Sequence, residues 1–284
     1  MKKIIRNCIF GIIFLVGLSL LLYPYIANQW NTYRQSRLMT TYEEEVAKID
    51  RETPIDYSAQ WEQARAYNDE LMPYVLPDSF AVAAASEEPD EEYMACLNLT
   101  GNGMMGYVNI PKINVKIPIY HTVKEDVLQT AAGHLEGSSL PVGGESTHAV
   151  ISAHRGLPSA ALFTDLDRLK EGDHFLVAVL DEILCYEVDR VSVVEPQDTD
   201  DLKIENGKDL VTLLTCTPYG VNSHRLLVRG HRVDYVEETV MKEEVPLGEI
   251  SIHTNYLLWI AVGLSVTGLF ILVLYITDRK RREK

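Results

Sequence analysis

In two segments of the chain, a predicted strand ends at a residue whose side chain can take part in catalysis. In the first, from Asp209 to Val233, Cys216 leaves one strand-like run and Arg225 enters the next. Leu and Val with interleaved polar residues favour strands, and Pro218 and Gly220 favour a turn between them. We therefore predict a hairpin in which a thiol and a guanidinium meet at one end of a sheet.

This pairing of residue types suits nucleophilic catalysis. A thiol beside a fixed positive charge is easier to deprotonate, and the thiolate is the nucleophilic form. A guanidinium also offers several N–H donors that can stabilise the oxyanion of an acyl intermediate. The alternative interpretation is a structural Cys216 beside an ordinary strand residue, Arg225.

In the second segment, from Thr147 to Gly156, a predicted strand also ends at a reactive side chain. An apolar run that begins at Thr147 ends at His154, and Gly156 turns the chain. An imidazole at a strand end can exchange protons near neutral pH, and His154 has the best context of the eight histidines. His224 is nearer to Cys216 in sequence but lies within the predicted turn.

The segment from Asp209 to Val233 resembles the signature of the sortases, membrane-anchored cysteine transpeptidases of Gram-positive bacteria. Their motif is Thr-Leu-x-Thr-Cys, a loop, and an Arg that opens the next strand; here it reads Thr212-Leu213-Leu214-Thr215-Cys216, followed by Arg225. The run from Cys216 to Gly230 is similar to class C, the pilin-polymerising sortases. The resemblance implies Cys216 as nucleophile, His154 as general acid and base, Arg225 for the oxyanion and substrate orientation, and Thr215 in the substrate groove.

Class C sortases carry a lid in which an Asp-Pro-aromatic triplet occupies the active site. The corresponding triplet is Asp78-Ser79-Phe80, so the carboxylate and the aromatic ring match, while Ser replaces Pro and restricts the backbone less. The resemblance implies that Asp78 faces Arg225 and that Phe80 covers Cys216. A disordered linker is the alternative for this segment.

Two apolar runs, residues 8–26 and 256–276, are each about long enough for a membrane helix. Basic residues flank the outer end of both, so the positive-inside rule predicts cytoplasmic termini and an extracellular catalytic domain at the cell membrane. The alternatives are a cleaved signal peptide for the first run and a cell-wall sorting signal for the second. Ala27 and Pro246-Leu247-Gly248 match those signals poorly.

Net charge and cysteine content limit the classes of ligand, metal and cofactor that the protein could bind. The formal charge is −15, and since the two terminal tails carry +3 each, the rest carries −21, which argues against nucleic acid as a ligand. The four cysteines form no Cys-x-x-Cys pair, so there is no zinc signature, and the chemistry requires no cofactor. Cys185 is expected to be buried, and a disulfide between Cys96 and Cys185 stays open.

Short apolar strands broken by Pro and Gly from Met104 onward favour a barrel or sandwich. With the resemblance, we predict a mainly β fold: a sortase-type closed β-barrel with short helices, preceded by a helical stem and lid, flanked by two transmembrane helices. Helical spacing predicts stem helices over 28–50 and 57–71, capped by Asp56 and ended by Pro73, and residues 129–135 read as a short helix and turn. The predicted organisation is 1–7 cytoplasmic basic tail, 8–26 transmembrane helix, 28–72 helical stem, 73–103 lid and linker, 104–235 catalytic barrel, 236–255 acidic tether, 256–276 transmembrane helix and 277–284 cytoplasmic basic tail.

The resemblance implies a function as well. A class C sortase cleaves an LPXTG-like sorting motif between Thr and Gly through a cysteine thioester and transfers the acyl group to a pilin lysine. Pilin subunits are then both the acyl donor and the lysine nucleophile. The alternatives are a housekeeping sortase that anchors surface proteins to the cell-wall precursor, a cysteine peptidase that releases the acyl group to water, and a non-catalytic assembly protein.

Overall fold

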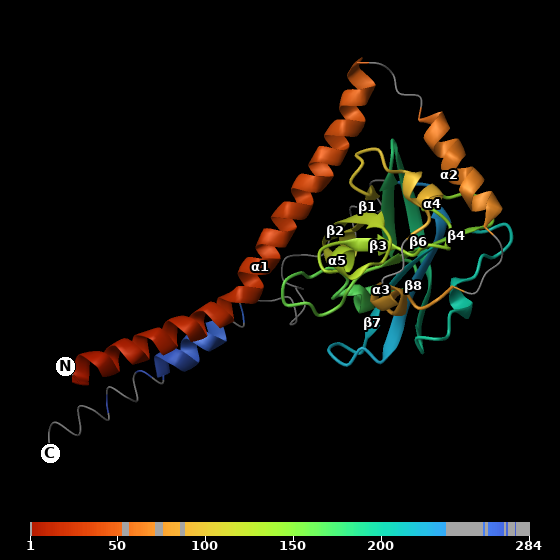
Figure 1. Ribbon diagram of the computed structural model, residues 1–284. Coiled ribbons are helices and arrows are strands. Elements are labelled where there is room, and N and C mark those ends of the chain that lie inside the picture. Colours follow the sequence, from red (N-terminus) through yellow and green to blue (C-terminus); the bar gives the residue numbers. More distant parts are fainter. Residues whose placement is uncertain are drawn as a thin grey trace.

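The computed structural model describes residues 2–52, 57–71, 76–85 and 89–236, together with residues 258, 261–269, 271 and 276. The predicted helix cap Asp56, the predicted helix end Pro73, nearly all of the predicted acidic tether and the tail 277–284 lie outside the described residues. The described part consists of a β-barrel with helices on its outside, one of which is much longer than the barrel itself (Figure 1).

Eight strands close into one barrel. In chain order they are β1 (Met104–Ile110), β2 (Val115–His121), β3 (Ala132–His134), β4 (Thr147–Ser152), β5 (His174–Val179), β6 (Glu182–Val194), β7 (Asp209–Thr217) and β8 (His224–Val233). Around the barrel the order is β1-β2-β3-β4-β7-β8-β6-β5. The pairs β2–β3 and β4–β7 are parallel and the others antiparallel. The prediction of a mainly β closed barrel is confirmed.

Alternation along the strands divides the side chains between the two faces of the barrel wall. On β4 and β7, Ile151 and Leu213 belong to the main buried cluster inside the barrel. Their neighbours Val150 and Leu214 belong to a second buried cluster, which also contains Leu76 from the chain before α3. The outer face of β4 and β7 is therefore apolar, and a segment from the N-terminal part of the chain covers it.

The helices lie outside the barrel (Figure 1). They are α1 (Lys2–Glu52), α2 (Ser58–Glu70), α3 (Ser79–Ala85), α4 (Glu91–Ala95) and α5 (Glu125–Leu128), with 3-10 turns η1 (Pro111–Ile113), η2 (Leu166–Arg168) and η3 (Asp200–Leu202). The sequence predicted a membrane helix and a separate stem helix, but α1 runs unbroken through both. Pro24 lies inside α1, and because proline removes a helical hydrogen bond it accounts for the bend seen along α1 in Figure 1.

The second half of α1 is bonded to the barrel. The Tyr42 hydroxyl accepts a hydrogen bond from Leu180 N at 3.0 Å, and Gln35 Nε2 donates to the Thr130 carbonyl at 2.6 Å. Among the described residues, one helical segment, Gly11–Ala47, is long and apolar enough to cross a membrane, with a mean hydropathy of 1.8. The same helix thus includes the segment that could enter a membrane and the contacts with the barrel.

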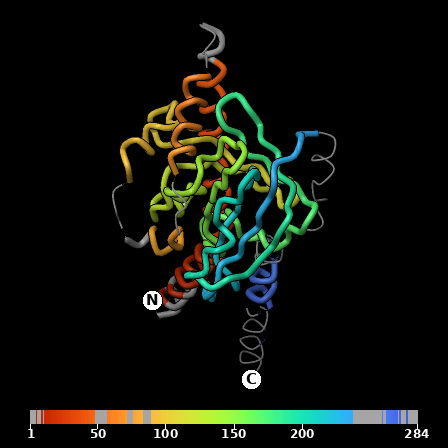
Figure 2. The backbone as a smooth tube through the Cα atoms, turned by 90° about the vertical axis from the view of Figure 1, so that its right-hand side faces the viewer, coloured from red at the N-terminus to blue at the C-terminus, as the bar shows by residue number. Residues whose placement is uncertain are grey.

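The described residues of the second apolar run, 258, 261–269, 271 and 276, are helical. They lie beside the first half of α1 in both Figure 1 and the perpendicular view of Figure 2. A Cβ added at Gly263 would lie 2.7 Å from a Leu21 methyl carbon. The absence of a side chain at Gly263 is therefore what permits this close approach.

The prediction of a short helix over residues 129–135 was wrong. α5 ends at Leu128, and residues 132–134 form β3, which pairs with β2 and β4. Three residues are too few to show a period, so the neighbouring strands decide their conformation. His134 in β3 is fully buried: the Tyr93 hydroxyl donates to its Nδ1 at 2.9 Å, and burial lowers its pKa to about 4. Its role is structural.

Candidate active site

Cys216 and Arg225 lie opposite each other in the β7–β8 hairpin, as one register pair near its turn. The connecting loop passes through Gly220 and Asn222, whose φ angles are +74° and +60°. Glycine and asparagine tolerate this left-handed conformation best. The predicted hairpin is therefore present, and it places the thiol beside the guanidinium. Only 6% of Cys216 is exposed.

His154 comes out at the same end of the barrel as Cys216. β4 and β7 run parallel, with Ser152 opposite Leu214, and Ala153 N still donates to the Leu214 carbonyl at 3.1 Å. Because parallel strands end at the same edge of a sheet, two residues beyond this pair in each strand bring His154 and Cys216 to one edge. The three residues predicted for catalysis thus gather where β4, β7 and β8 end.

Thr215 does not face the same side as Cys216. Its side chain is fully buried, and its Oγ1 donates to the Ala153 carbonyl at 2.7 Å. It shares the face of β7 with Leu213, which belongs to the cluster inside the barrel. The prediction of a groove residue is therefore corrected: Thr215 ties the strand that carries Cys216 to the strand that carries His154.

The Asp78 carboxylate binds the Arg225 guanidinium with two parallel hydrogen bonds. Arg225 Nε donates to Oδ1 at 2.6 Å and Nη2 donates to Oδ2 at 2.7 Å, and both side chains are about one-tenth exposed. The remaining nitrogen, Nη1, donates to the carbonyls of Asn222 and His224 at 3.3 and 3.2 Å. With these contacts, all three guanidinium nitrogens donate hydrogen bonds, and four of the five N–H groups are in use.

Phe80 and Ser79 complete the cover over the site. The Phe80 ring centroid lies 5.2 Å from that of His154 and 5.0 Å from Arg225 Cζ, so one ring contacts both residues. Ser79 is fully buried, and the Ser152 hydroxyl donates to its Oγ at 2.8 Å. The residue that stands in place of the family's proline therefore adds a hydrogen bond to β4 that proline cannot make.

The electrostatics of this closed arrangement disfavour the thiolate. Burial raises the pKa of the Cys216 thiol to about 11, an increase that the positive charge of Arg225 opposes and the negative charge of Asp78 reinforces. A thiolate is needed for nucleophilic attack. In this arrangement the thiol form of Cys216 is favoured, and the Arg225 guanidinium is bound to Asp78.

A buried apolar cluster lies on the outer face of the strands that carry the three residues. It contains Val150 of β4, Leu214 of β7, Leu227 of β8 and Leu202 of η3. Phe80 and Val82 of α3 pack against this cluster. The segment that contacts His154 and Arg225 therefore also covers the apolar outer face.

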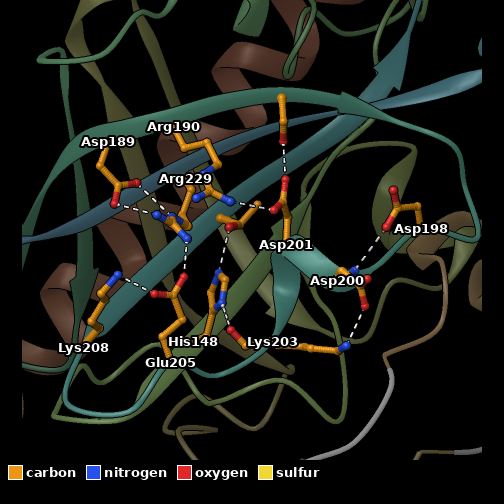
Figure 3. Close-up of polar contacts among 12 residues, drawn as sticks. His148, Asp189, Arg190, Asp198, Asp200, Asp201, Lys203, Glu205, Lys208 and Arg229 are labelled. Carbon is orange, nitrogen blue, oxygen red and sulfur yellow. Dashed lines mark hydrogen bonds and ion pairs between the residues drawn. The ribbon is translucent and has the colours of Figure 1, made fainter.

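The loop between β6 and β7 is fixed to the barrel by a network of polar contacts (Figure 3). Arg229 of β8 donates two hydrogen bonds to Asp189, each 2.9 Å long, and one to Glu205 of the loop at 2.6 Å. Two further contacts hold the same loop, from Arg190 to Asp201 at 2.7 Å and from His148 Nδ1 to the Lys203 carbonyl at 2.8 Å. These contacts hold the loop that carries Leu202 against β4, β6 and β8.

The sequence did not indicate Glu125, whose carboxylate lies next to His154. Its Oε2 is 3.5 Å from His154 Nε2. An acidic residue in a polar stretch 29 positions before the histidine carries no signal, because the contact arises only when α5 packs beside β3, the strand that pairs with β4. The other candidate, His224, has its Nδ1 2.8 Å from the Ser223 hydroxyl, and its register partner across the hairpin is Thr217, whereas that of Cys216 is Arg225.

The cysteines give a clear result. None of the described cysteines Cys96, Cys185 and Cys216 forms a disulfide, and all three are buried, so no disulfide joins Cys96 to Cys185. Cys185 packs against Leu176 in a small apolar cluster, which confirms the prediction that it is buried. Cys216 is therefore the one described thiol that stands among ionisable partners at a strand end.

A closed barrel that presents a cysteine, a histidine and an arginine at neighbouring strand ends defines a class of cysteine-dependent acyl transferases. Residues 108–233 match the model of the sortase domain. Sortase A of Bacillus anthracis is 29% identical over 154 residues, which is 54% of this chain and 71% of that protein.

Sequence identity is higher to two solved sortase structures than to this relative. The chain is similar to sortase C1 of Streptococcus agalactiae, with 48% identity, 70% of this chain and 100% of that one covered, and a TM-score of 0.62. It is also similar to sortase C-1 of Streptococcus pneumoniae, with 46% identity, the same coverage and a TM-score of 0.63. The chain belongs to the sortase family of cysteine transpeptidases, and these relatives identify it as a class C sortase.

Proposed function

We propose that this sortase polymerises pilins. It cleaves an LPXTG-like sorting motif between Thr and Gly and transfers the acyl group to a lysine of another pilin subunit. The observation that carries the proposal is the pair of hydrogen bonds from Arg225 to Asp78, which closes the site with a lid built on the class C triplet. The similar sortase C of Streptococcus pneumoniae has a pilin substrate specificity, which supports the same substrate class here.

The chemistry assigned to the site proceeds in two half-reactions. The Cys216 thiolate attacks the Thr carbonyl carbon, the new C–S bond forms and the C–N bond to Gly breaks, while His154 gives a proton to the leaving nitrogen. The lysine amine then attacks the thioester, the C–S bond breaks, and His154 accepts the proton that the amine loses. Arg225 stabilises the oxyanion in both steps.

The lid must leave before these steps begin. Asp78 occupies the donors of Arg225 that an oxyanion needs, and Phe80 contacts His154 on the side of the guanidinium. Once the lid has left, the apolar cluster against which Val82 packs would offer Leu227 and Leu214 to the apolar residues of a sorting motif. A peptide that replaces the lid would therefore exchange one set of apolar contacts for another, which keeps the cost of opening low.

We also propose the membrane arrangement that the charge pattern predicts. α1 would anchor the protein, the second apolar run would form a second membrane helix beside it, both termini would be cytoplasmic, and the barrel would be extracellular. The close approach of Gly263 to Leu21 supports two adjacent helices. Cysteine accessibility on intact cells tests the arrangement: a cysteine introduced at Glu136, which lies on the barrel, should react with a membrane-impermeant reagent, and one at Lys284 should not.

Two other activities compete with pilin polymerisation. A housekeeping sortase would transfer the acyl group to the cell-wall precursor, and a peptidase would transfer it to water. The lid favours transfer over hydrolysis, because a closed site limits hydrolysis when no acceptor is present, and the similarity to class C sortases supports a pilin acceptor over the cell-wall precursor. The identity of the acceptor distinguishes the three, since the products differ in mass.

Intact-mass spectrometry on the full chain in detergent micelles, incubated with an LPXTG peptide, tests the proposal. We expect a Cys216 adduct equal to the peptide less its Gly-side fragment, and an amide product when a pilin fragment with an accessible lysine is added. A Cys216→Ala chain is the matched control. Products formed only with a cell-wall-type amine, or only with water, would refute pilin polymerisation.

A further inference from the structure

His154 has an unsatisfied ring nitrogen that faces one carboxylate. Nε2 is buried and makes no hydrogen bond to the described residues. The nearest ionic partner is Glu125 Oε2 at 3.5 Å, slightly beyond hydrogen-bond length. A buried, unpaired polar atom costs free energy, so this geometry requires an explanation.

The Glu125 carboxylate is oriented by its own helix. Glu125 is the first residue of α5, and Gln129 Nε2 donates to its Oε1 at 2.5 Å. That bond leaves Oε2 as the oxygen that faces His154. Leu128, on the same short helix, is fully buried in the cluster beneath the lid. The Gln129 bond thus orients the carboxylate and the burial of Leu128 anchors its helix, although the Glu125 side chain is 57% exposed.

We propose that Glu125 is the positioning residue for His154. It accepts the Nε2 hydrogen, holds the imidazole plane, and stabilises the positive charge that the ring carries as an imidazolium. The other ring nitrogen, Nδ1, is then the atom that exchanges protons with the substrate. The proposal rests on the acid and base role of His154 proposed above.

The lid explains why the contact is 3.5 Å rather than a full hydrogen bond. Phe80 packs against the imidazole with ring centroids 5.2 Å apart. When the lid leaves, a shift of a few tenths of an ångström brings Nε2 within bonding distance of Oε2, about 2.7–3.2 Å. The pair therefore tightens in the open, working state.

Glu125 affects both half-reactions through the same charge. In acylation the imidazolium gives its proton to the Gly nitrogen and becomes neutral; in aminolysis the neutral ring takes a proton from the amine and becomes imidazolium again. Glu125 neither gains nor loses a proton. A substitution that removes its charge should therefore slow both steps by a similar factor, whatever the charge of the acceptor amine.

The test compares Glu125→Gln with Asp126→Asn in the full chain in detergent micelles. Asp126 is the next residue of α5 but borders a pocket beneath α1 with Arg34 and Gln35, so the control removes the same charge without touching His154. We expect Glu125→Gln to lower the acylation rate constant at saturating peptide about tenfold and to leave KM within about twofold of the wild-type value. A tenfold loss is smaller than the whole rate contribution of general acid–base catalysis, because His154 itself is still present. Asp126→Asn should match the wild type.

Two acceptors separate this role from a role in substrate binding. A lysine-like amine is cationic, and hydroxylamine is uncharged at neutral pH. Equal slowing of transfer to both supports the proposal. Slowing with the lysine-like amine alone would show that Glu125 binds the acceptor ammonium, and unchanged acylation or a change in KM alone would show that it does not act on His154; each of these overturns the proposal.

A spectroscopic readout separates failure of this inference from failure of the proposed function. In chains labelled with ¹⁵N-histidine, the Nε2 resonance of His154, assigned by its loss in His154→Ala, should move in Glu125→Gln and not in Asp126→Asn. This holds even if the wild-type chain forms no adduct with an LPXTG peptide, in which case only the substrate assignment fails. An unmoved resonance would refute the contact itself.

Discussion

Replacing Asp78 by Ala should open the lid and expose the thiol. The substitution removes both hydrogen bonds to Arg225, at 2.6 and 2.7 Å. Losing one partner of a buried ion pair costs about 3–5 kcal/mol when the other charge stays buried. Arg225 regains water when the lid moves, so the cost falls on the closed state alone.

The size of the effect follows from that difference. Taking the lower end, about 3 kcal/mol, and 1.4 kcal/mol for each factor of ten, the open fraction should rise about a hundredfold. Phe80→Ala, added to the first substitution, removes the contacts with His154 and Arg225 and should increase it further. If alkylation of Cys216 requires opening, its rate rises by the same factor until the open form dominates.

The pH dependence of alkylation should change as well. Burial and the charge of Asp78 both raise the pKa of the Cys216 thiol, which is about 11 in the closed site, whereas Arg225 lowers it. Opening the lid without Asp78 removes both causes of the increase and keeps the opposing one. Because the thiolate is the reactive form, the rise of alkylation rate with pH should move to lower pH in Asp78→Ala.

The assay is iodoacetamide alkylation of the full chain in detergent micelles, followed by digestion and mass spectrometry of the Cys216 peptide. The buried Cys96 and Cys185 report unfolding in the same sample. Asp189→Ala is the matched control, because Asp189 also accepts two hydrogen bonds from an arginine of β8. An unchanged Cys216 rate in Asp78→Ala, or an equal increase in the control, would refute the lid.

Three further outcomes are expected. Arg225→Lys, measured in the lid-open background, should lower kcat about a hundredfold with an unchanged thermal melt, since an ammonium does not reproduce the guanidinium donors and one lost oxyanion donor costs about 3 kcal/mol; near-normal turnover would contradict the oxyanion role. Thr215→Val should lower the free energy of unfolding by about 1 kcal/mol by removing the bond to the Ala153 carbonyl, with KM for the peptide unchanged; a raised KM would restore Thr215 to the groove. Burial lowers the pKa of His134 from 6.5 to about 4, so His134 binds a proton less readily in the folded protein than in the unfolded one. Its contribution to the free energy of unfolding is therefore fully present above pH 6.5 and is lost as pH falls toward 4. Urea unfolding across that interval measures the loss, and a constant free energy of unfolding would contradict it.

Two parts of the structure show where local patterns were insufficient. Residues 129–135 were predicted as a short helix and turn, yet residues 132–134 form β3. This strand lies between β2 and β4 and pairs with both of them through its backbone. The resemblance to the sortases implied a groove role for Thr215, yet Thr215 and its neighbour Cys216 point to opposite faces of their strand. In both cases the answer depended on neighbours distant in sequence.

The amino-acid sequence by itself determined a mainly β fold, the hairpin and the positions of Cys216, His154 and Arg225 at strand ends, because alternating apolar residues and turn formers act over a few residues. The strand pattern left a barrel and a sandwich open, and the resemblance to the sortases favoured the closed barrel. Only the tertiary structure decided which groups meet there. The two bonds between Asp78 and Arg225 join residues 147 positions apart, and Glu125 reaches His154 from a different element. Such contacts depend on how the lid and α5 pack on the outer face of the strands, and packing between distant segments leaves no local pattern in a sequence.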